Sequence, residues 1–296
     1  MKLGIDLGGS KIEIIALRED GVELFRRRVP TPIGDYPATL RAVAELVQAA
    51  ETELGQSGML GIGTPGTVSR LTGRLKNSNS QHLIGQAIVA DLESLLARPI
   101  KICNDANCFA LSEATNGAAR GAPVVFGVIL GTGVGAGIVV NGQVLTGPNG
   151  IAGEWGHNPL PWAEADDLPG PKCYCGRRGC IETYLSGPGM AALHLQQTGV
   201  SLSPPAIAAA AAQGDSDCEH SLQRYENRLA RALAHVINIL DPEVIVLGGG
   251  MSNLERIYRH VPTLWGHWVF SDQVDTGLVQ NHFGDSSGVR GAAWLW

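Results

Sequence analysis

The sequence has 296 residues, of which 44% are hydrophobic and 17% charged, and its net charge is −6 at pH 7. This composition excludes a disordered chain and leaves room for two domains with sizeable cores. The acidic balance argues against nucleic acid as a partner, because phosphate binding needs a basic face. The start of the chain lacks a signal-peptide pattern, and no apolar run approaches the roughly 20 residues that a membrane span requires. Together with six cysteines, which fit a reducing compartment, this predicts a cytoplasmic protein without membrane contact.

A strand, a glycine-rich hairpin and a second strand open the chain. Residues 2–6 are predicted as a buried strand, and further strands are expected over 12–17 and 23–29. A hairpin with so few side chains lets backbone N–H groups approach a polyphosphate, and Asp6 just before it is placed to meet Mg²⁺ or its waters. The candidate phosphate-binding residues are Gly8, Gly9, Ser10 and Lys11. A tight hairpin without a ligand is the alternative, and the spacing is not that of a Walker A loop.

The next segment alternates between helix and strand. Asp35 is expected to cap a helix over 36–54, a short strand follows at 60–63, and a polar loop occupies 76–80. The loop contains Asn79, whose amide could be presented to a sugar, although such a polar cluster usually marks only a turn.

An acidic residue stands at the end of the following strand. After a helix over 87–97, residues 100–103 are predicted as a strand and 106–116 as a helix, with Asn104 and Asp105 between them. Active sites of α/β proteins lie at the carboxyl ends of strands, so Asp105 is a candidate general base that accepts a hydroxyl proton. The competing interpretation makes Asp105 only a helix N-cap.

A second strand–glycine–strand unit resembles the first. Residues 124–130 predict a buried strand and 138–140 another, after which Asn141 and Gly142 signal a hairpin. The turn between the two strands contains Gly131, Thr132 and Gly133. One unit is thus used twice, and two such hairpins facing each other would clamp a nucleotide.

Three cysteines fall within eight positions, with a histidine sixteen residues upstream. Thiolates and an imidazole are the ligand set of a closed, tetrahedral structural zinc site. The predicted zinc ligands are His157, Cys173, Cys175 and Cys180. Disulfides or plain buried thiols are the alternatives, but three clustered cysteines cannot all pair among themselves. The other three cysteines are expected to pack as small hydrophobic side chains.

Two acidic residues accompany the predicted metal loop. Glu154 precedes His157 by three residues, and Glu182 follows Cys180 by two. A metal that fixes the loop would also fix both carboxylates and the free edge of His157, which suits the recognition of a polyol. Solvated surface acids are the alternative.

The remainder of the chain is predicted to be mostly helical. Helices are expected over 206–213 and 219–240, and a strand over 244–247. Glycines after that strand suggest close approach by a flat ligand such as adenine, with a flexible connection as the alternative. These glycines include Gly248 and Gly249. The tail 284–294 is expected to end in a short apolar helix that packs back on one of the domains.

These motifs resemble the ROK family of repressors, open reading frames and kinases over the whole chain. The matching segments are 6–11, 104–107, 131–133, 153–157 and 173–182. Within the family the chain looks most like bacterial fructokinases that also accept mannose. The segments behind this closer likeness are 76–80, Trp155, 157–162 and 284–296. Residues 104–114 and 131–137 also resemble N-acetylglucosamine kinase, and Ser10 replaces the threonine common in the family while keeping a hydroxyl.

The resemblance implies an actin-like ATPase fold, in which two ribonuclease-H-like α/β domains surround a cleft. We expect a small domain over 1–116 with the C-terminal helix 285–296, and a large domain over 117–284. The resemblance also implies ATP, Mg²⁺ and zinc, and often a homodimer. It makes Asp105 the catalytic base. It assigns the sugar contacts to Asn104, Glu154, His157 and Glu182, with looser matches at Asn79 and Gly66. His157 would then place one ring nitrogen on zinc and the other toward the sugar.

The expected activity is direct transfer of phosphate from ATP to the primary hydroxyl of a hexose, D-fructose and D-mannose first, giving the 6-phosphate. N-acetylglucosamine and glucose are the alternative substrates. A sugar-responsive repressor of the family would carry a DNA-binding domain ahead of the sugar domain, and a first strand at Lys2 leaves no room for one. A sugar sensor without turnover would typically have lost Asp105 or the first hairpin, and both are present.

Overall fold

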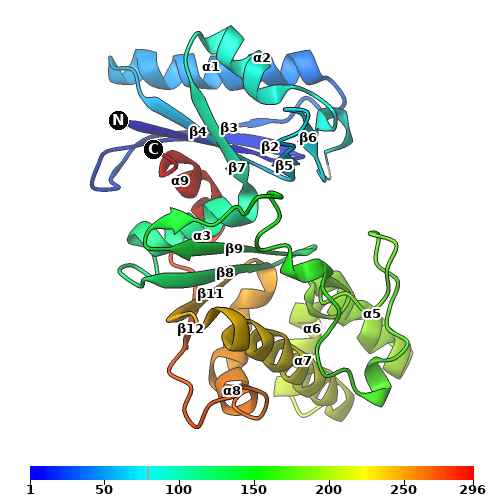
Figure 1. The fold of residues 1–296 in the computed structure, drawn as a ribbon. Helices are drawn as coiled ribbons and strands as arrows, with labels where there is room; N and C mark the ends of the chain where they lie inside the picture. Colours follow the sequence, from blue (N-terminus) through cyan, green and yellow to red (C-terminus); the bar gives the residue numbers. More distant parts are fainter. Residues whose placement is uncertain (79) are drawn as a thin grey trace. The chain divides into compact units, whose positions relative to one another are not determined.

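The computed structural model describes residues 1–78 and 80–296, so the predicted sugar contact Asn79 lies outside the described residues. Strands and helices alternate along most of the chain, and two five-stranded sheets carry the fold (Figure 1). The predicted α/β class is therefore confirmed. Among the residues that the structure describes, no helix combines the length and the apolarity that crossing a membrane requires.

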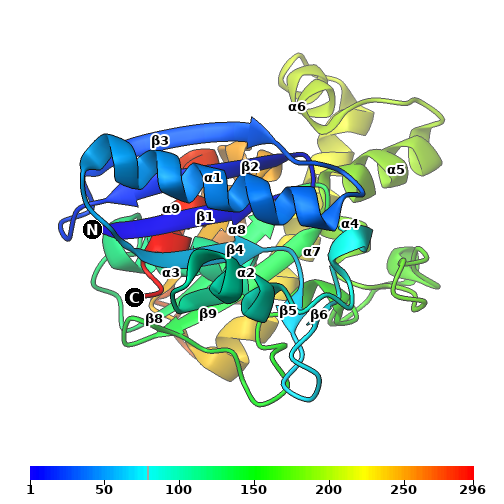
Figure 2. The same cartoon turned by 90° about the horizontal axis from the view of Figure 1, so that it is seen from above.

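The first sheet has the strand order β3-β2-β1-β4-β7. Its strands are β1 (Lys2–Leu7), β2 (Lys11–Leu17), β3 (Glu23–Pro30), β4 (Met59–Thr64) and β7 (Ile100–Asn104). The helices around it are α1 (Tyr36–Leu54), α2 (Ile88–Leu96), α3 (Asp105–Asn116) and α9 (Ser287–Ala293). Figure 2 shows α1 lying over the strands of this sheet. Since side chains alternate between the two faces of a strand, Leu3 and Ile14 join the core beneath α1 whereas Ile15 and Leu17 pack against α9.

Glycines allow α9 to lie directly on this sheet. A Cβ atom at Gly4 would come within 2.2 Å of the Val289 carbonyl oxygen, and one at Gly61 within 1.9 Å of the Ala292 carbonyl oxygen. Distances this short admit no side chain, so only glycine permits the contact. The prediction that the tail ends in a helix packed on the body of the protein is confirmed.

The second sheet has the strand order β10-β9-β8-β11-β12. Its strands are β8 (Val124–Leu130), β9 (Val134–Val140), β10 (Gln143–Val144), β11 (Val244–Gly248) and β12 (Gly277–Gln280). The helices that follow β10 in sequence, up to β12, are α4 (Glu182–Leu185), α5 (Gly187–Thr198), α6 (Pro204–Ala212), α7 (Ser216–Leu240) and α8 (Arg256–Trp265). A small separate sheet pairs β5 (Thr67–Val68) with β6 (Leu75–Lys76). The predicted hairpin is present after β9, where Asn141 and Gly142 adopt positive φ angles of 49° and 74°.

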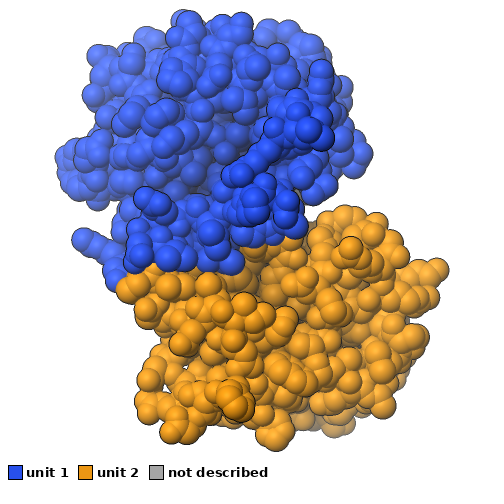
Figure 3. Space-filling model, viewed as in Figure 1, with its two compact units in different colours: residues 1–121, 137–152, 282–296 blue, residues 122–136, 153–281 orange. Residues whose placement is uncertain are grey.

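By its internal contacts the chain divides into two compact units (Figure 3). Unit 1 comprises residues 1–121, 137–152 and 282–296, and unit 2 comprises 122–136 and 153–281. This division differs from the predicted domain boundaries chiefly because residues 137–152 belong to unit 1 and not to the unit that contains most of the predicted large domain. A physical reason lies at Gly137, where a Cβ atom would lie 2.6 Å from the Ala106 carbonyl oxygen, so that β9 meets the start of α3 at this glycine and β10 contacts α3 beyond it.

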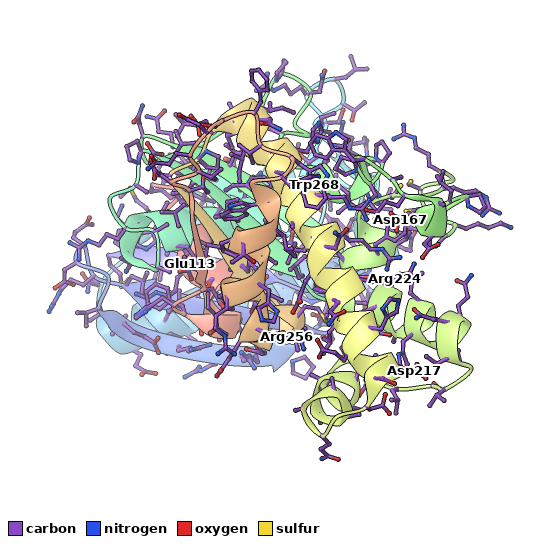
Figure 4. All side chains as sticks on the ribbon, turned by 90° about the horizontal axis from the view of Figure 1, so that it is seen from below. Glu113, Asp167, Asp217, Arg224, Arg256 and Trp268 are labelled. Atoms are coloured by element: carbon purple, nitrogen blue, oxygen red, sulfur yellow. The ribbon has the colours of Figure 1, made fainter. Side chains whose placement is uncertain are left out.

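A buried acid ties together the ends of unit 1. Glu113 on α3 is fully buried, and its carboxylate accepts hydrogen bonds from the N–H groups of Ala118 (2.8 Å) and His282 (3.0 Å) and from the Ser287 hydroxyl (2.7 Å) (Figure 4). Ala118 and His282 lie near the points where the chain leaves unit 1 and re-enters it. Glu113 therefore fixes the first and the last of the four points where the chain passes between the units against the same helix.

Candidate functional site

The first glycine-rich hairpin is held by its own backbone. The Gly8 N–H donates to the Lys11 carbonyl oxygen at 3.0 Å, and the buried Thr31 hydroxyl donates to the Gly8 carbonyl oxygen at 2.7 Å. Asp6 stands two residues before the turn, near the carboxyl end of β1. Gly9 and Ser10 are exposed at the tip, so their N–H groups can be reached by a ligand.

Asp105 begins α3, but it is not the N-cap. The cap is Asn104, whose side chain accepts the Ala106 N–H at 2.9 Å, and the Asp105 carboxylate accepts the same N–H at 2.8 Å. The Asn104 amide also donates to the Gly66 carbonyl oxygen at 3.2 Å. The N-cap alternative for Asp105 is thus excluded, because its neighbour performs that role. Asp105 stands at the end of β7, as predicted.

Asp6 and Asp105 act on each other electrostatically within unit 1. Burial, followed by the negative charge of Asp105, raises the pKa of Asp6 to about 6. Lys11 and Arg28 oppose this shift without cancelling it. Two neighbouring carboxylates, one of them short of solvent, form an oxygen-donor pair that a hard cation such as Mg²⁺ would stabilise.

In unit 2 the second hairpin contacts Glu182, two residues after the last cysteine of the Cys–His cluster. The Glu182 carboxylate accepts the Val134 N–H at 3.0 Å. A Cβ atom at Gly133 would lie 2.6 Å from the same carboxylate, so a glycine is needed for this approach. The other Glu182 oxygen lies 3.9 Å from Cys173 Sγ. Two predicted features far apart in sequence, the hairpin and the cysteine cluster, are therefore joined by one acid.

An apolar pocket of about 770 Å³ lies beside the second hairpin. Gly131 and Thr132 line it, as does Gly250, whereas Gly249 packs its backbone against Leu130. The rest of the lining was not predicted from the sequence, and it includes Pro188, Ala191, Pro204, Met251 and Leu254. The sequence contains a partial signal for this pocket, because Ser186 and Ser203 each cap a helix that has proline in its first turn. Such signals indicate where α5 and α6 begin, but not that both beginnings lie at one pocket.

The four predicted zinc ligands converge. One ligand atom from each of these four residues lies within 4.8 Å of the others. His157 Nδ1 is 3.6 Å from Cys173 Sγ, and Cys175 Sγ is 3.6 Å from Cys180 Sγ. Tetrahedral Zn–S bonds of about 2.3 Å would separate two sulfur ligands by about 3.7 Å, so the spacing fits the metal. The second ring nitrogen, His157 Nε2, contacts the Tyr174 hydroxyl at 2.9 Å.

Without a bound cation, two of the three thiols in this cluster are harder to ionise than an ordinary thiol. Burial raises the pKa of Cys180 to about 12 and also raises the pKa of Cys173. The backbone N–H of Arg177 lowers the pKa of Cys175. A bound divalent cation would reverse the two upward shifts, because metal-bound thiols are held as thiolates.

The long loop between His157 and Cys173 is anchored to α7 by buried charges. The Asp167 carboxylate is 2.8 Å from Arg228 Nε and 2.8 Å from Arg231 Nη2. Burial alone would raise the pKa of Asp167, but the N–H of Glu164 and the two guanidinium groups outweigh it and lower the pKa. Figure 4 shows Asp167 beside α7. The loop therefore has a second support besides its cysteines.

The predicted sugar contacts are distributed over both units. Asn104 belongs to unit 1, and Glu154, His157 and Glu182 belong to unit 2. Glu154 is exposed and precedes the short 3₁₀ turn Trp155–His157. A Cβ atom at Gly156 in this turn would lie 2.1 Å from the Val134 carbonyl oxygen, so the turn is pressed against β9.

Comparisons with known proteins agree with this architecture over the whole chain. A model of the ROK family matches residues 2–296. An N-acetyl-D-glucosamine kinase from Yersinia pseudotuberculosis serotype O:3 is 41% identical, over 100% of this chain and 98% of that protein. Another N-acetyl-D-glucosamine kinase, from Vibrio vulnificus, is 39% identical over 100% of this chain and 99% of its own length.

Solved structures of the same family superpose closely. A ROK hexokinase from Thermus thermophilus has a TM-score of 0.88 at 31% identity, covering 99% of this chain and 97% of its own. A ROK family glucokinase from Streptomyces griseus, solved with glucose and AMPPNP, has a TM-score of 0.75 at 27% identity, and the match covers 99% of this chain and 98% of that one. The chain belongs to the ROK family. The predicted actin-like ATPase fold is confirmed.

Proposed function

We propose that this chain transfers the γ-phosphate of ATP to the primary hydroxyl of N-acetyl-D-glucosamine. It is an ATP-dependent sugar kinase of the ROK family. The observation that carries the choice of sugar is the 41% identity, over the full chain, to a protein named N-acetyl-D-glucosamine kinase. The preference predicted from the sequence, D-fructose with D-mannose, is not supported by these relatives, which favour the stated alternative.

Within unit 1, the residues at the ends of β1 and β7 supply the acid–base chemistry of the proposed reaction. Asp105 orients the sugar hydroxyl and accepts its proton as phosphate is transferred, while Asn104 positions the neighbouring sugar oxygens. The Asp6 carboxylate fits a Mg²⁺ site, since it is poorly solvated and close to a second carboxylate. Mg²⁺, when bound, would neutralise charge on the transferring phosphates.

Unit 2 contains the features that suit adenosine. The apolar pocket of about 770 Å³ has the size and character of a site for a flat heterocycle, with Gly131 and Thr132 at its edge. The exposed N–H groups of the first hairpin and of this one are the proposed phosphate contacts. Gly248 and Gly249 act through their backbone shape, since Gly249 has a φ of 81° and a Cβ atom there would lie 2.5 Å from the Leu130 carbonyl oxygen.

The Cys–His cluster is proposed to bind one structural zinc ion. The donor set and the spacing of about one tetrahedral edge between sulfur atoms support this assignment. Zinc would hold the loop that presents Glu154, His157 and Glu182 to the sugar. Nδ1 of His157 faces the cysteines, whereas Nε2 contacts the Tyr174 hydroxyl at 2.9 Å, so a sugar would have to replace that contact to bind Nε2.

The test is ADP release by purified protein with ATP and Mg²⁺ over a panel of N-acetyl-D-glucosamine, D-fructose, D-mannose and D-glucose. We expect the highest kcat/KM on N-acetyl-D-glucosamine. A preference for D-fructose would restore the original substrate prediction and overturn this one. No ADP release with any sugar, from protein shown to contain zinc, would count against the kinase itself. The homodimer and the cytoplasmic location remain predictions.

A further inference from the structure

Two cysteines of unit 1 flank Asp105 and have no part in the site described above. Cys103 is the next-to-last residue of β7, and Cys108 ends the first turn of α3. Both are free thiols. Cys103 is partly exposed and belongs to the wall of a cavity of about 160 Å³, whereas Cys108 is 0% exposed. A small oxidant that comes from solvent therefore reaches Cys103 first.

The two thiols lie over neighbouring positions on one face of the first sheet. Cys103 pairs in register with Gly63 of β4, and register partners on parallel strands point to the same face, with their backbones about 4.8 Å apart. A Cβ atom at Gly63 would lie 3.2 Å from Cys108 Sγ and 3.6 Å from Cys108 Cβ. Cys108 thus covers the glycine beside Cys103. In agreement, a hydrogen bond donated by the Cys108 thiol lowers the pKa of Cys103 and raises that of Cys108.

We propose that Cys103 and Cys108 are a redox modification site, which hydrogen peroxide converts to a reversible disulfide that inactivates the kinase. The Cys103 thiolate attacks the peroxide: an S–O bond forms, the O–O bond breaks, and hydroxide leaves, so that Cys103 becomes a sulfenic acid. The Cys108 sulfur then displaces the hydroxyl group, which takes the Cys108 proton and leaves as water while the S–S bond forms. The two thiols lose two electrons and the peroxide gains them. A dithiol reductant reverses the reaction and is itself oxidised to a disulfide.

Closing this bond would displace the end of β7. The backbone of Cys108 is fixed against α9, because a Cβ atom at Gly291 would lie only 1.7 Å from the Cys108 carbonyl oxygen. β7 is at the edge of its sheet, so Cys103 is the easier of the two to move. Asn104 and Asp105 directly follow Cys103 and would move with it. A misplacement of about 1 Å can cost on the order of 10²-fold in rate. The loss of rate rests on the proposed role of Asp105, whereas the disulfide does not.

The test combines peptide mapping with kinase assays after limited treatment with hydrogen peroxide. Trypsin cuts after Lys101 and Arg120, so both cysteines fall in one peptide, residues 102–120, which contains no third cysteine. In oxidised wild type we expect this peptide to be lighter by two hydrogen atoms and unreactive toward an alkylating agent. Turnover of ATP with the best sugar of the panel should fall roughly 10²-fold, and dithiothreitol should restore it.

Cys103→Ser and Cys218→Ser give the matched comparison. Cys103→Ser should keep its own untreated activity after the same peroxide treatment. Cys218→Ser, which removes a buried thiol from α7 in unit 2, should be inactivated like wild type. Zinc content is measured in every sample, because the thiols of the Cys–His cluster are oxidisable as well. We expect zinc to be retained at the peroxide dose that inactivates wild type.

The outcomes separate this inference from the proposed function. Absence of the disulfide from peptide 102–120, or equal inactivation of Cys103→Ser and wild type, overturns the proposal. A disulfide that forms without loss of turnover also overturns it. A wild type without activity on any sugar overturns the proposed function instead, and the peptide map still decides whether the two thiols form a pair. The same map on wild type decides this if Cys103→Ser does not fold.

Discussion

The acid pair of unit 1 and the Cys–His loop of unit 2 are held in place by different physical means. Asp6 ends a strand that is hydrogen-bonded on both sides, by β2 and by β4, and Asp105 starts a capped helix. The loop 158–172 belongs to no sheet. Its backbone makes two isolated bridges, Pro159 with Cys180 and Lys172 with Arg178, and one short 3₁₀ helix, Ala165–Asp167, and the buried ion pairs of Asp167 add to these. Backbone ladders spread their support over many residues, whereas the loop depends on a few groups. A single change should therefore disturb the Cys–His loop more than the acid pair.

Metal removal is the strongest way to expose this difference. Chelation of zinc should release the loop, because the buried thiols then regain their protons and lose their common ligand. We expect amides in 153–182 to lose protection in hydrogen-exchange mass spectrometry, while those in 2–17 and 100–116 keep it, and we expect kinase activity to be lost. Cys180→Ser should behave like the chelated protein. Cys218→Ser, at a buried thiol on α7 outside the cluster, is the control and should retain zinc. Unchanged exchange in 153–182 after verified zinc loss would refute the assigned role of the metal.

Asp105→Asn tests the acid pair of unit 1, where we expect a loss of catalytic rate without a loss of folding stability. The amide keeps the shape and can still accept the Ala106 N–H, but it cannot take a proton. We expect kcat to fall roughly 10²- to 10⁴-fold with little change in the urea midpoint. Asp35→Asn, at the cap of α1, is the matched control with intact activity. Near-normal turnover of Asp105→Asn would show that another group is the base.

Asp167→Ala addresses the second support of the loop. The change would leave Arg228 and Arg231 buried without their anion, which costs about 3–5 kcal/mol in comparable cases. The neighbouring Asp166 pairs with Arg224 across 3.7 Å, but its side chain is 74% exposed, so Asp166→Ala should cost under about 0.5 kcal/mol. Urea unfolding of both variants gives the comparison. Equal losses would mean that burial of the ion pair is not what anchors the loop.

Among these variants we expect Asp6→Asn to have the smallest effect, and it should increase the free energy of unfolding. The folded protein holds the Asp6 proton more tightly than the unfolded chain, with a pKa of about 6 against 3.8. The free energy of unfolding should therefore decrease as the pH rises from about 4 to 6, and the loss stays in place above that range. In Mg²⁺-free buffer at pH 7.5, Asp6→Asn should be more stable than wild type by about 3 kcal/mol, and the difference should fall below about 1 kcal/mol near pH 4. Added Mg²⁺ should reduce this difference in stability between Asp6→Asn and wild type. If wild type and variant showed the same pH dependence of unfolding, that would argue against a raised pKa of Asp6 in the folded protein.

Local sequence signals were enough wherever neighbours along the chain decide the structure. Helix α1 spans Tyr36–Leu54 as predicted, because Asp35 caps it and Gly55 ends it in a left-handed conformation. Strand β8 also has its predicted bounds. The convergence of the four Cys and His ligand atoms follows from spacing within one short stretch. Strand β9, in contrast, begins at Val134 and not at residue 138, because glycines that look like turn residues in sequence lie in a strand approached closely by other backbone.

The sequence by itself determined the α/β class, the two glycine-rich hairpins, Asp105 at a strand end and the Cys–His stretch. Each is encoded by side chains a few positions apart, through strand and helix periodicity, caps and ligand spacing. Only the tertiary structure decided that Asp167 meets Arg228 and Arg231 and that α5 and α6 begin at one apolar pocket. These contacts join residues tens of positions apart, and they depend on how complete faces of helices and sheets pack, which no local pattern specifies.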